Sequence, residues 1–324
     1  MTEESTNRLL LVKAKGGFGN RILSAVTGIT LASVTSRTAV IDWRDGDYMP
    51  RGVNAYPMLF DDPVGIDVAQ FDERTDVAPP IWRGRLGEYP VDIIEQFFPQ
   101  DHSNPRIYRK LSVDLARPQV DEPLAVFWSY LPKPARIRKH VAHNPRFKSM
   151  RPAAVTKVAL DQYFRPNQRV RDEVTALLSG RRHPIIGVHI RYTDRKVSLR
   201  RIMSEVARLR KKMPDAPIFL ATDNERVQAI FRAKVDNVFV IEKRLGDDAN
   251  SLHEQAPAKN ALHEAENALI DMWALAGCDW IIHSRHSTFS VTAALIGGIP
   301  RARQRDIDRW NPRVVSKRWI QAWT

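Results

Sequence analysis

The chain has 324 residues and a formal net charge of +13 at pH 7, with 27% charged and 43% hydrophobic residues. This composition is typical of a folded globular protein and excludes a disordered chain. No apolar run approaches the roughly 20 residues of a membrane-spanning helix, and the N-terminus has the acidic residues Glu3 and Glu4 where a secretory signal is basic. We therefore expect a cytoplasmic protein with no membrane span.

The N-terminal part predicts one strand, turn, helix and strand unit of the kind that builds parallel sheets. Between residues 44 and 134, prolines interrupt every periodic run, so we expect irregular loops around a single clear strand, 123–128. The predicted elements of the first unit are a strand at 8–14, a glycine turn at 16–19, a helix at 20–37 and a strand at 38–43.

Basic residues are densest in segment 133–151, which contains no acidic residue. Two interpretations stay open: a solvated connection between domains, or an electrostatic surface for an anionic ligand. The overall charge likewise fits either a nucleic acid or a small nucleotide as partner. The one cysteine, Cys278, excludes an intramolecular disulfide and lies in an apolar stretch, so we assign it to packing.

Strands and helices alternate regularly in the C-terminal half, which predicts a doubly wound α/β domain. In the helix expected at 261–277, apolar residues recur at steps of three and four, so one face should be buried. We expect an N-terminal α/β domain at 1–165 and a C-terminal one at 166–304. A tail at 305–324 should pack back on the body through Trp310, Trp319 and Trp323.

Polar segments follow four of the predicted strands. Ligands of open parallel sheets bind outside the carboxyl ends of the strands, so these segments should line one edge of a cleft between two domains. The segments are KGGFGNR at 15–21, RYTDR at 191–195, TDNE at 222–225 and SRHSTFS at 284–290.

The glycine turn lets backbone approach a ligand closely, and the helix that starts near Asn20 presents unpaired N–H groups to an anion. The spacing of Gly16, Gly17 and Gly19 is not G-x-G-x-x-G and no Walker lysine follows, so it predicts neither a dinucleotide site nor an ATPase. A structural turn and a phosphate or sugar contact both stay open.

His189 and Arg191 share a face at the end of their strand. The guanidinium of Arg191 offers a bidentate fork for a diphosphate, and Asp194 could hold that fork by an ion pair. An ordinary ion pair at a strand end is the alternative. The roles of Ser287 and Thr288 also stay open, because these residues could receive phosphate at a helix N-terminus or serve only as caps.

Asp45 and Asp47 have the D-x-D spacing with which metal-dependent glycosyltransferases bind a divalent cation. No further carboxylates cluster with them, so we predict no metal site.

Five motifs resemble those of the GDP-fucose fucosyltransferase superfamily, in particular its NodZ-type rhizobial members. They follow the family's order from about residue 10 to 298: GGFGNRI, VIDWR, GVHIRYTDR, IFLATDN and ALIDMWALAGCDWIIHSRHSTFS. The resemblance implies a GT-B-like α/β fold of two facing Rossmann-type domains with a cleft between them. It also implies a metal-independent, inverting transfer of fucose from GDP-fucose to a glycan or other hydroxyl acceptor, without a cofactor.

The resemblance also implies roles for individual residues. Arg191 would bind the β-phosphate and stabilise the departing GDP, while His189 and Asp271 would contact the guanosine. The remaining donor-binding residues are Ser287 and Thr288 at the diphosphate, Gly17, Gly19 and Asn20 at the phosphate and sugar, and Asp223 in the IFLATDN motif.

The sequence also departs from the family's pattern. Tyr192 stands where many relatives carry a second arginine, which leaves the donor sugar open. The glutamate base of mammalian-type α1,6 enzymes corresponds here to Ser198 or Leu199, so no base is assigned. Candidates are Asp194, Asp42 and Asp45, and a loose transition state that needs little from a base is the alternative. Trp43 could stack on an acceptor sugar or pack in the core.

Three other functions remain: a GT-B transferase with a different nucleotide sugar, a basic nucleic-acid-binding protein, and a catalytically silent nucleotide-binding relative. No helix-turn-helix, zinc or RNA-module signature supports a nucleic-acid partner. We expect a nucleotide-sugar donor and an oligosaccharide-like acceptor as partners, and the sequence leaves the oligomeric state open.

Overall fold

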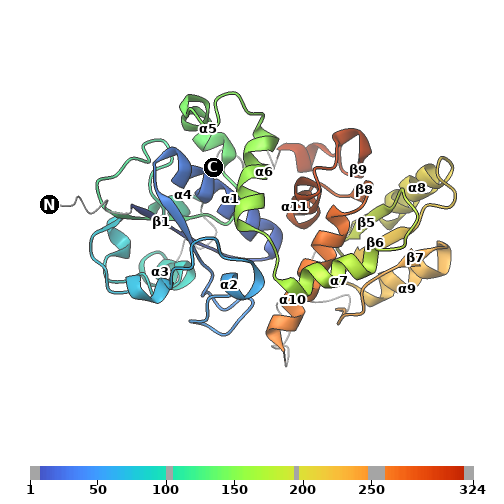
Figure 1. Cartoon of the computed structure of the whole chain (residues 1–324), viewed down its shortest axis with the longest axis horizontal. Coiled ribbons are helices and arrows are strands. Elements are labelled where there is room, and N and C mark those ends of the chain that lie inside the picture. Colours follow the sequence, from blue (N-terminus) through green and yellow to red (C-terminus); the bar gives the residue numbers. More distant parts are fainter. Residues whose placement is uncertain (1–7, 100–104, 193–196, 247–259, 317–324) are drawn as a thin grey trace. The chain divides into compact units, whose positions relative to one another are not determined.

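The structure, a computed structural model, describes residues 8–99, 105–192, 197–246 and 260–316. The chain divides into two compact units, with the boundary between Arg165 and Pro166. Each unit contains one sheet in which all strand pairs are parallel (Figure 1). In the part of the chain that the structure describes, no helix is long and apolar enough to cross a membrane.

Unit 1 contains a four-stranded sheet in the order β2-β1-β4-β3. Every residue of the central strands β1 and β4 is buried, as expected for a parallel sheet that is covered on both faces. Their register places Lys13 beside both Asp42 and Trp128 at the carboxyl ends. The strands are β1 (Leu9–Lys13), β2 (Thr38–Asp42), β3 (Val77–Ala78) and β4 (Leu124–Trp128).

The long helix α1 (Phe18–Val34) packs against β1 and β2. Gly28 makes this close approach possible. A Cβ atom at this position would lie 2.7 Å from Cδ1 of Phe127 and 2.9 Å from Cγ2 of Val12. Since both neighbours belong to buried strands, the contact leaves no room for a side chain.

The proline-rich part of unit 1 is more helical than expected. Prolines occupy the first position of α3, α4, α5 and α6, where the missing N–H costs nothing and the fixed φ suits a helix. The expectation of irregular loops between 44 and 134 was therefore wrong where α2, α3 and α4 lie. The helices are α2 (Tyr56–Leu59), α3 (Pro90–Phe97), α4 (Pro105–Lys110), α5 (Pro134–His143) and α6 (Pro152–Tyr163), with 3-10 turns at Val68–Phe71 and Pro80–Trp82.

Unit 2 contains a five-stranded sheet in the order β7-β6-β5-β8-β9. Numbered within the unit, this is 3-2-1-4-5, the Rossmann order, with the topological switch between β5 and β8. The strands are β5 (Ile186–Ile190), β6 (Ile218–Thr222), β7 (Val238–Phe239), β8 (Trp280–His283) and β9 (Gln304–Asp306). The helices are α7 (Gln168–Leu178), α8 (Leu199–Arg210), α9 (Glu225–Lys234), α10 (Ala261–Ala276) and α11 (Thr288–Ile296), with a 3-10 turn at Arg301–Arg303.

The expected buried face of α10 is largely present. Ala265, Leu269 and Met272 are buried, and the helix packs against α7 and α11. The regular alternation of strands and helices therefore predicted the α/β architecture of this unit.

The segment after residue 304 differs from the expected tail. Residues 304–306 form β9, which pairs with β8, so the sheet of unit 2 continues beyond the boundary that we expected. Trp310 is 84% exposed rather than packed on the body, which corrects the expectation for this residue. Trp319 and Trp323 lie outside the described residues.

Gly28→Ala should lower the stability of unit 1. Alanine favours a helix by about 1 kcal/mol over glycine, but forcing a methyl group into this contact costs about 1–3 kcal/mol. Since Phe127 and Val12 are fixed in the sheet, we expect the steric cost to exceed the helical gain. Urea unfolding would measure the difference, and Gly28→Val should be worse. A stability equal to or above the wild type for Gly28→Ala would contradict the tight packing.

Candidate functional site

Polar side chains from three neighbouring strands meet at the carboxyl edge of the unit 2 sheet. Val188 pairs with Ile282, so the following residues, His189 and His283, lie beside each other across the switch point. Asp223 follows β6, and its Oδ1 accepts a hydrogen bond of 2.8 Å from the backbone N–H of Tyr192. The structure thus brings together three of the four segments that the sequence indicated.

His189 is buried and electrically neutral. Its ring is 8% exposed and stacks on Phe289, with centroids 5.2 Å apart and planes at 19°. Burial, followed by the neighbouring His283, Arg191 and Lys243, lowers the pKa of His189 to about 3. A neutral imidazole presents one donor and one acceptor, which suits recognition of a base or ribose better than of a phosphate.

Asp271 and Lys243 form a buried ion pair close to His189. Oδ2 of Asp271 accepts a hydrogen bond from Nζ of Lys243, and their side chains are 5% and 11% exposed. Burial raises the pKa of Asp271 although Lys243 opposes the shift. Among the described residues, nothing donates to Oδ1 of Asp271, which is buried. Leaving a buried carboxylate oxygen unpaired is costly, so this atom is suited to accept N–H groups of a ligand.

Lys243 was not among the expected site residues. The signal was present, because Lys243 belongs to a charged run that follows β7, at the same carboxyl edge as the other segments. Applying the strand-end rule to β7 would have found it.

The N-terminus of α11 completes this edge. Ser287 is the N-cap residue, yet its side chain makes no capping hydrogen bond, and among the described residues its buried Oγ has no partner. Thr288 begins the helix. Next to them, Nδ1 of His283 lies 3.0 Å from Oγ of Ser290. The helix end therefore retains an unused hydroxyl group and its positive dipole.

Arg191 follows β5 directly and is half-buried. Its charge contributes to the lowered pKa of His189, so the two side chains are neighbours at the same edge. Asp194, which was expected to hold the guanidinium, lies outside the described residues.

In unit 1, side chains from the segment after β2 accept hydrogen bonds from the backbone of the glycine turn. The N–H of Gly16 donates to Oδ2 of Asp47 at 2.7 Å, and the N–H of Phe18 donates to the hydroxyl group of Tyr48 at 2.8 Å. Gly17 is the N-cap of α1, and Gly19 and Asn20 lie in its first turn. Two N–H groups at this helix end thus already have acceptors, which supports a structural role for the turn.

Asp45 and Asp47, the D-x-D pair, bind a buried guanidinium. Arg21 is 1% exposed and donates to both oxygens of Asp45 at 3.1 and 2.8 Å and to Asp47 at 2.8 Å. Its Cζ lies 5.0 Å from the ring centroids of Trp43 and Tyr48. Burial raises the pKa of Asp45 despite Arg21. The described residues contain no group of three or more potential metal ligands.

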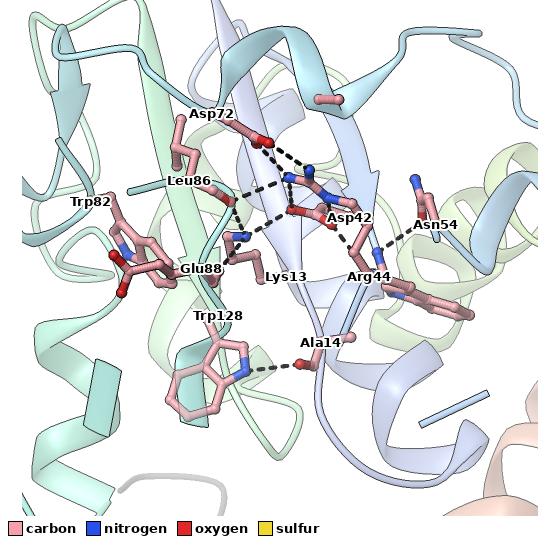
Figure 2. A network of polar contacts seen from close by, with 12 residues as sticks. Lys13, Ala14, Asp42, Arg44, Asn54, Asp72, Trp82, Leu86, Glu88 and Trp128 are labelled. Carbon is pink, nitrogen blue, oxygen red and sulfur yellow. Dashed lines mark hydrogen bonds and ion pairs between the residues drawn. The ribbon is translucent and has the colours of Figure 1, made fainter. Parts of the chain in front are cut away.

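Asp42, a candidate base, lies in a second buried network (Figure 2). It accepts hydrogen bonds from Nζ of Lys13 at 2.8 Å and from Nε and Nη2 of Arg44 at 2.9 and 3.1 Å. Arg44 also pairs with Asp72 at 2.8 Å, and Lys13 donates to the carbonyl of Leu86 at 2.6 Å. Burial alone would raise the pKa of Asp42, but the two cations lower it. Its carboxylate is therefore fixed and weakly basic.

Trp43 lies in an aromatic cluster of the core. Its side chain is 1% exposed, and its ring centroid is 5.6 Å from Tyr56, 5.8 Å from Phe60 and 6.0 Å from Phe164. Of the two roles considered for Trp43, the structure displays core packing.

Comparisons with known proteins place these residues in context. The profile of the family described as Nodulation protein Z (NodZ) matches residues 155–316. The chain is 24% identical over 312 residues to Nodulation protein Z of Bradyrhizobium diazoefficiens, covering 86% of this chain and 76% of that protein. It is 23% identical over 303 residues to Nodulation protein Z of Azorhizobium caulinodans, covering 85% and 84%.

Solved structures share the fold. The NodZ alpha-1,6-fucosyltransferase soaked with GDP-fucose has a TM-score of 0.62 at 22% identity, covering 90% of this chain and 92% of that one. POFUT1 in complex with GDP-fucose has a TM-score of 0.53 at 12% identity, covering 94% and 98%. The likeness confirms the expected fold class, GT-B-like with Rossmann-type α/β units.

Asp42→Asn should destabilise the protein by about 3 kcal/mol, because Lys13 and Arg44 would lose their buried counter-charge. Since the pKa of Asp42 is lowered on folding, its contribution is complete above about pH 4 and is lost as the pH falls through the folded pKa. Urea unfolding at pH 7 and pH 3.5 would measure both effects. Asp92→Asn, which breaks an exposed pair with Arg51, is the control and should cost less than about 1 kcal/mol.

His189→Gln should flatten the pH dependence of stability. The pKa of His189 is lower in the folded state, so its contribution is complete above about pH 6.5 and is lost as the pH falls toward 3. Between pH 6.5 and 5.5 the wild type should lose about 1 kcal/mol that the variant retains. Equal losses in both proteins would show that folding does not lower the pKa of His189. His143→Gln, at an exposed position, is the control.

Proposed function

Because the chain belongs to the NodZ family, we propose that it is a glycosyltransferase that moves fucose from GDP-fucose to a glycan or other hydroxyl acceptor. The observation that carries this proposal is the carboxyl edge of unit 2, where His189, Arg191 and the Lys243–Asp271 pair gather within the residues that the family profile matches. The related NodZ enzyme has crystal structures soaked with GDP-fucose and co-crystallised with GDP, which supports the same donor here.

Guanine is the base that fits the pair best. Oδ1 of Asp271 is buried and lacks a donor among the described residues, while Lys243 fixes the other oxygen. Guanine carries N–H groups on the ring nitrogen and the exocyclic amine of one edge, and a carboxylate accepts from both. Adenine and uracil do not offer this pair. Neutral His189, stacked on Phe289, would contact the nucleoside beside it.

The diphosphate would meet Arg191 and the N-terminus of α11. Breaking the glycosidic bond leaves negative charge on GDP, and donors already aimed at that charge lower the barrier. A guanidinium fork suits two phosphate oxygens, and Ser287 adds a buried hydroxyl group at the helix end where Thr288 begins. These groups provide a cationic environment for the leaving group, so we propose a transfer that needs no metal ion.

Asp223 would act on this arrangement indirectly. Its carboxylate holds the backbone of Tyr192, the residue after Arg191, and thereby orients the end of β5. The unit 1 residues Gly17, Gly19 and Asn20 remain proposed donor contacts on the strength of the resemblance.

A general base contributes little in this proposal. Asp42 accepts hydrogen bonds from buried cations on both oxygens and its pKa is lowered, which weakens it as a base. Both oxygens of Asp45 accept hydrogen bonds from buried Arg21, which leaves this carboxylate poorly placed to receive a proton from an acceptor. Asp194 lies outside the described residues. We therefore favour an inverting displacement through a loose transition state, in which leaving-group stabilisation is the main protein contribution.

Thermal unfolding with nucleotides tests the donor site. GDP should raise the melting temperature, because a ligand that binds only the folded state stabilises it. ADP, UDP and oligonucleotides should not. Incubation with GDP-fucose and a glycan panel, followed by mass spectrometry, should then detect an added deoxyhexose. A shift with UDP instead of GDP would contradict the proposal, as would a GDP shift without transfer to any acceptor.

Arg191→Lys and Arg191→Ala should both lose most transfer activity, about 10²-fold or more, because a single ammonium group cannot reproduce the bidentate fork. Steady-state turnover with GDP-fucose is the measurement. Exposed Arg200, at the start of α8, gives the control Arg200→Lys. Unchanged turnover in Arg191→Lys would remove the bidentate role, and unchanged turnover in Arg191→Ala would remove Arg191 from the reaction.

A further inference from the structure

Lys243 is held at the carboxyl edge of the unit 2 sheet by a segment whose backbone is fixed. After β7, the chain returns to the end of β6, where Gly246 pairs with Asn224 in an isolated bridge. The N–H of Gly246 donates to the carbonyl of Asp223 at 2.9 Å, and its carbonyl accepts from the N–H of Glu225 at 3.3 Å. Fully buried Asn224 caps α9 at the same point. The backbone beyond Lys243 is thereby tied to the sheet, which restricts where its side chain can reach.

The ion pair of Lys243 with Asp271 is too incomplete to be explained by stability alone. Both side chains are buried, and one oxygen of Asp271 accepts a hydrogen bond from Nζ of Lys243. The other oxygen, Oδ1, is buried without a donor within the described part of the chain. Replacing a buried ion pair by apolar residues is often neutral or stabilising, so a half-satisfied pair offers the fold little. Asp42 in unit 1 shows the complete arrangement, because Lys13 and Arg44 bond to both of its oxygens.

Charged groups from several elements act on Asp271. Burial raises its pKa, Lys243 after β7 opposes this shift, and Asp223 at the end of β6 adds to it. Helix α10, which carries Asp271, also packs against β5, α7 and α11. From these elements, His189 is neutral, Arg169 pairs with a glutamate earlier on α10, and α11 has no charged residue. Of these groups, Lys243 favours the charged carboxylate, whereas burial and Asp223 oppose it.

We infer that Lys243 is a positioning residue of the donor site, which keeps Asp271 charged and oriented for guanine and so sets the lowest pH at which the nucleotide binds. This inference rests on the proposed function and adds its regulation by pH. A carboxylate has about four lone-pair positions, so Oδ2 can accept from Lys243 while both oxygens receive the two N–H groups of guanine. Protonation would turn one oxygen into a donor that opposes those N–H groups. Lys243 thus acts through Asp271 and need not touch the ligand.

Calorimetric titration of the full chain with GDP at pH 6, 7, 8 and 9 tests this role. Asp271 must be deprotonated to accept from guanine, so the affinity falls as the pH drops through the pKa of Asp271. Lys243→Met removes the charge that opposes burial and should raise that pKa further. We expect this variant to bind GDP about tenfold or more weakly than the wild type at pH 7, with a ratio of affinities that narrows toward pH 9. The ionisation of GDP itself cancels in this ratio.

Two matched variants isolate the charge. Lys243→Arg keeps a cation beside Asp271 and should recover most of the affinity at pH 7. Lys234→Met changes an exposed lysine at the end of α9 and should have no effect. Melting temperatures without nucleotide show whether each variant is folded during the titration. Should Lys243→Met be unfolded, Lys243→Gln keeps a donor to Oδ2 without the charge and should show the same change with pH.

Asp271→Asn separates an indirect from a direct role of Lys243. This variant removes the titrating group, so its GDP affinity should be low. If Lys243 acts through Asp271, then adding Lys243→Met in this background should change the affinity less than about twofold, because the effects of two residues that act as one unit are not additive.

Each outcome decides the inference. Wild-type affinity in Lys243→Met and Lys243→Gln over the whole pH range would overturn it. A loss that is the same at every pH, or that persists in the Asp271→Asn background, would also overturn it, because that pattern indicates a direct contact of Lys243 with the nucleotide. Failure of the wild type to bind GDP at any pH would instead count against the proposed function.

Discussion

Buried ion pairs at the carboxyl ends of parallel strands are the constraint on which both units depend. Removing charges from water is costly, so each must be paired where the strands give way to loops. In unit 1, Lys13 and Arg44 satisfy both oxygens of Asp42. In unit 2, Lys243 satisfies one oxygen of Asp271, and the other lacks a partner among the described residues. The first carboxylate is complete without a ligand, whereas the second one is suited to receive one.

Elsewhere, too, the surroundings of a charged side chain indicate whether it stabilises the fold or is suited to bind a ligand. Arg21 is enclosed by two carboxylates and two aromatic rings, so it fixes the segment after β2 against the glycine turn. Lys133 and Arg136 have a lowered pKa, which means that their surroundings disfavour their charge. Both interpretations of the basic segment stay open, since Lys133 and Arg136 line a pocket of unit 1 while Arg138 and Lys139 are exposed.

Strand-end reasoning predicted which residues of unit 2 lie together, for a physical reason. Parallel strands of one sheet end at one edge, so the sequence positions of His189, Asp223 and Ser287 already fixed their neighbourhood. The partners of Arg21 were not predictable in this way, because Asp45 and Asp47 fold back from a loop whose path depends on packing. The prolines in the middle of unit 1 did not predict its helices, since proline interrupts a helix or begins one according to its position.

The short strand β9 has a consequence for how unit 2 is isolated. Its three residues cover the edge of β8, and its side chains include Arg305 and Asp306, charges of the kind that discourage one sheet from joining another. A fragment that stopped at residue 303 would leave the apolar strand β8 with open backbone groups, inviting intermolecular strand addition and insoluble protein. Expression of the C-terminal half alone should therefore extend beyond Asp308, which accepts a hydrogen bond from Ser284.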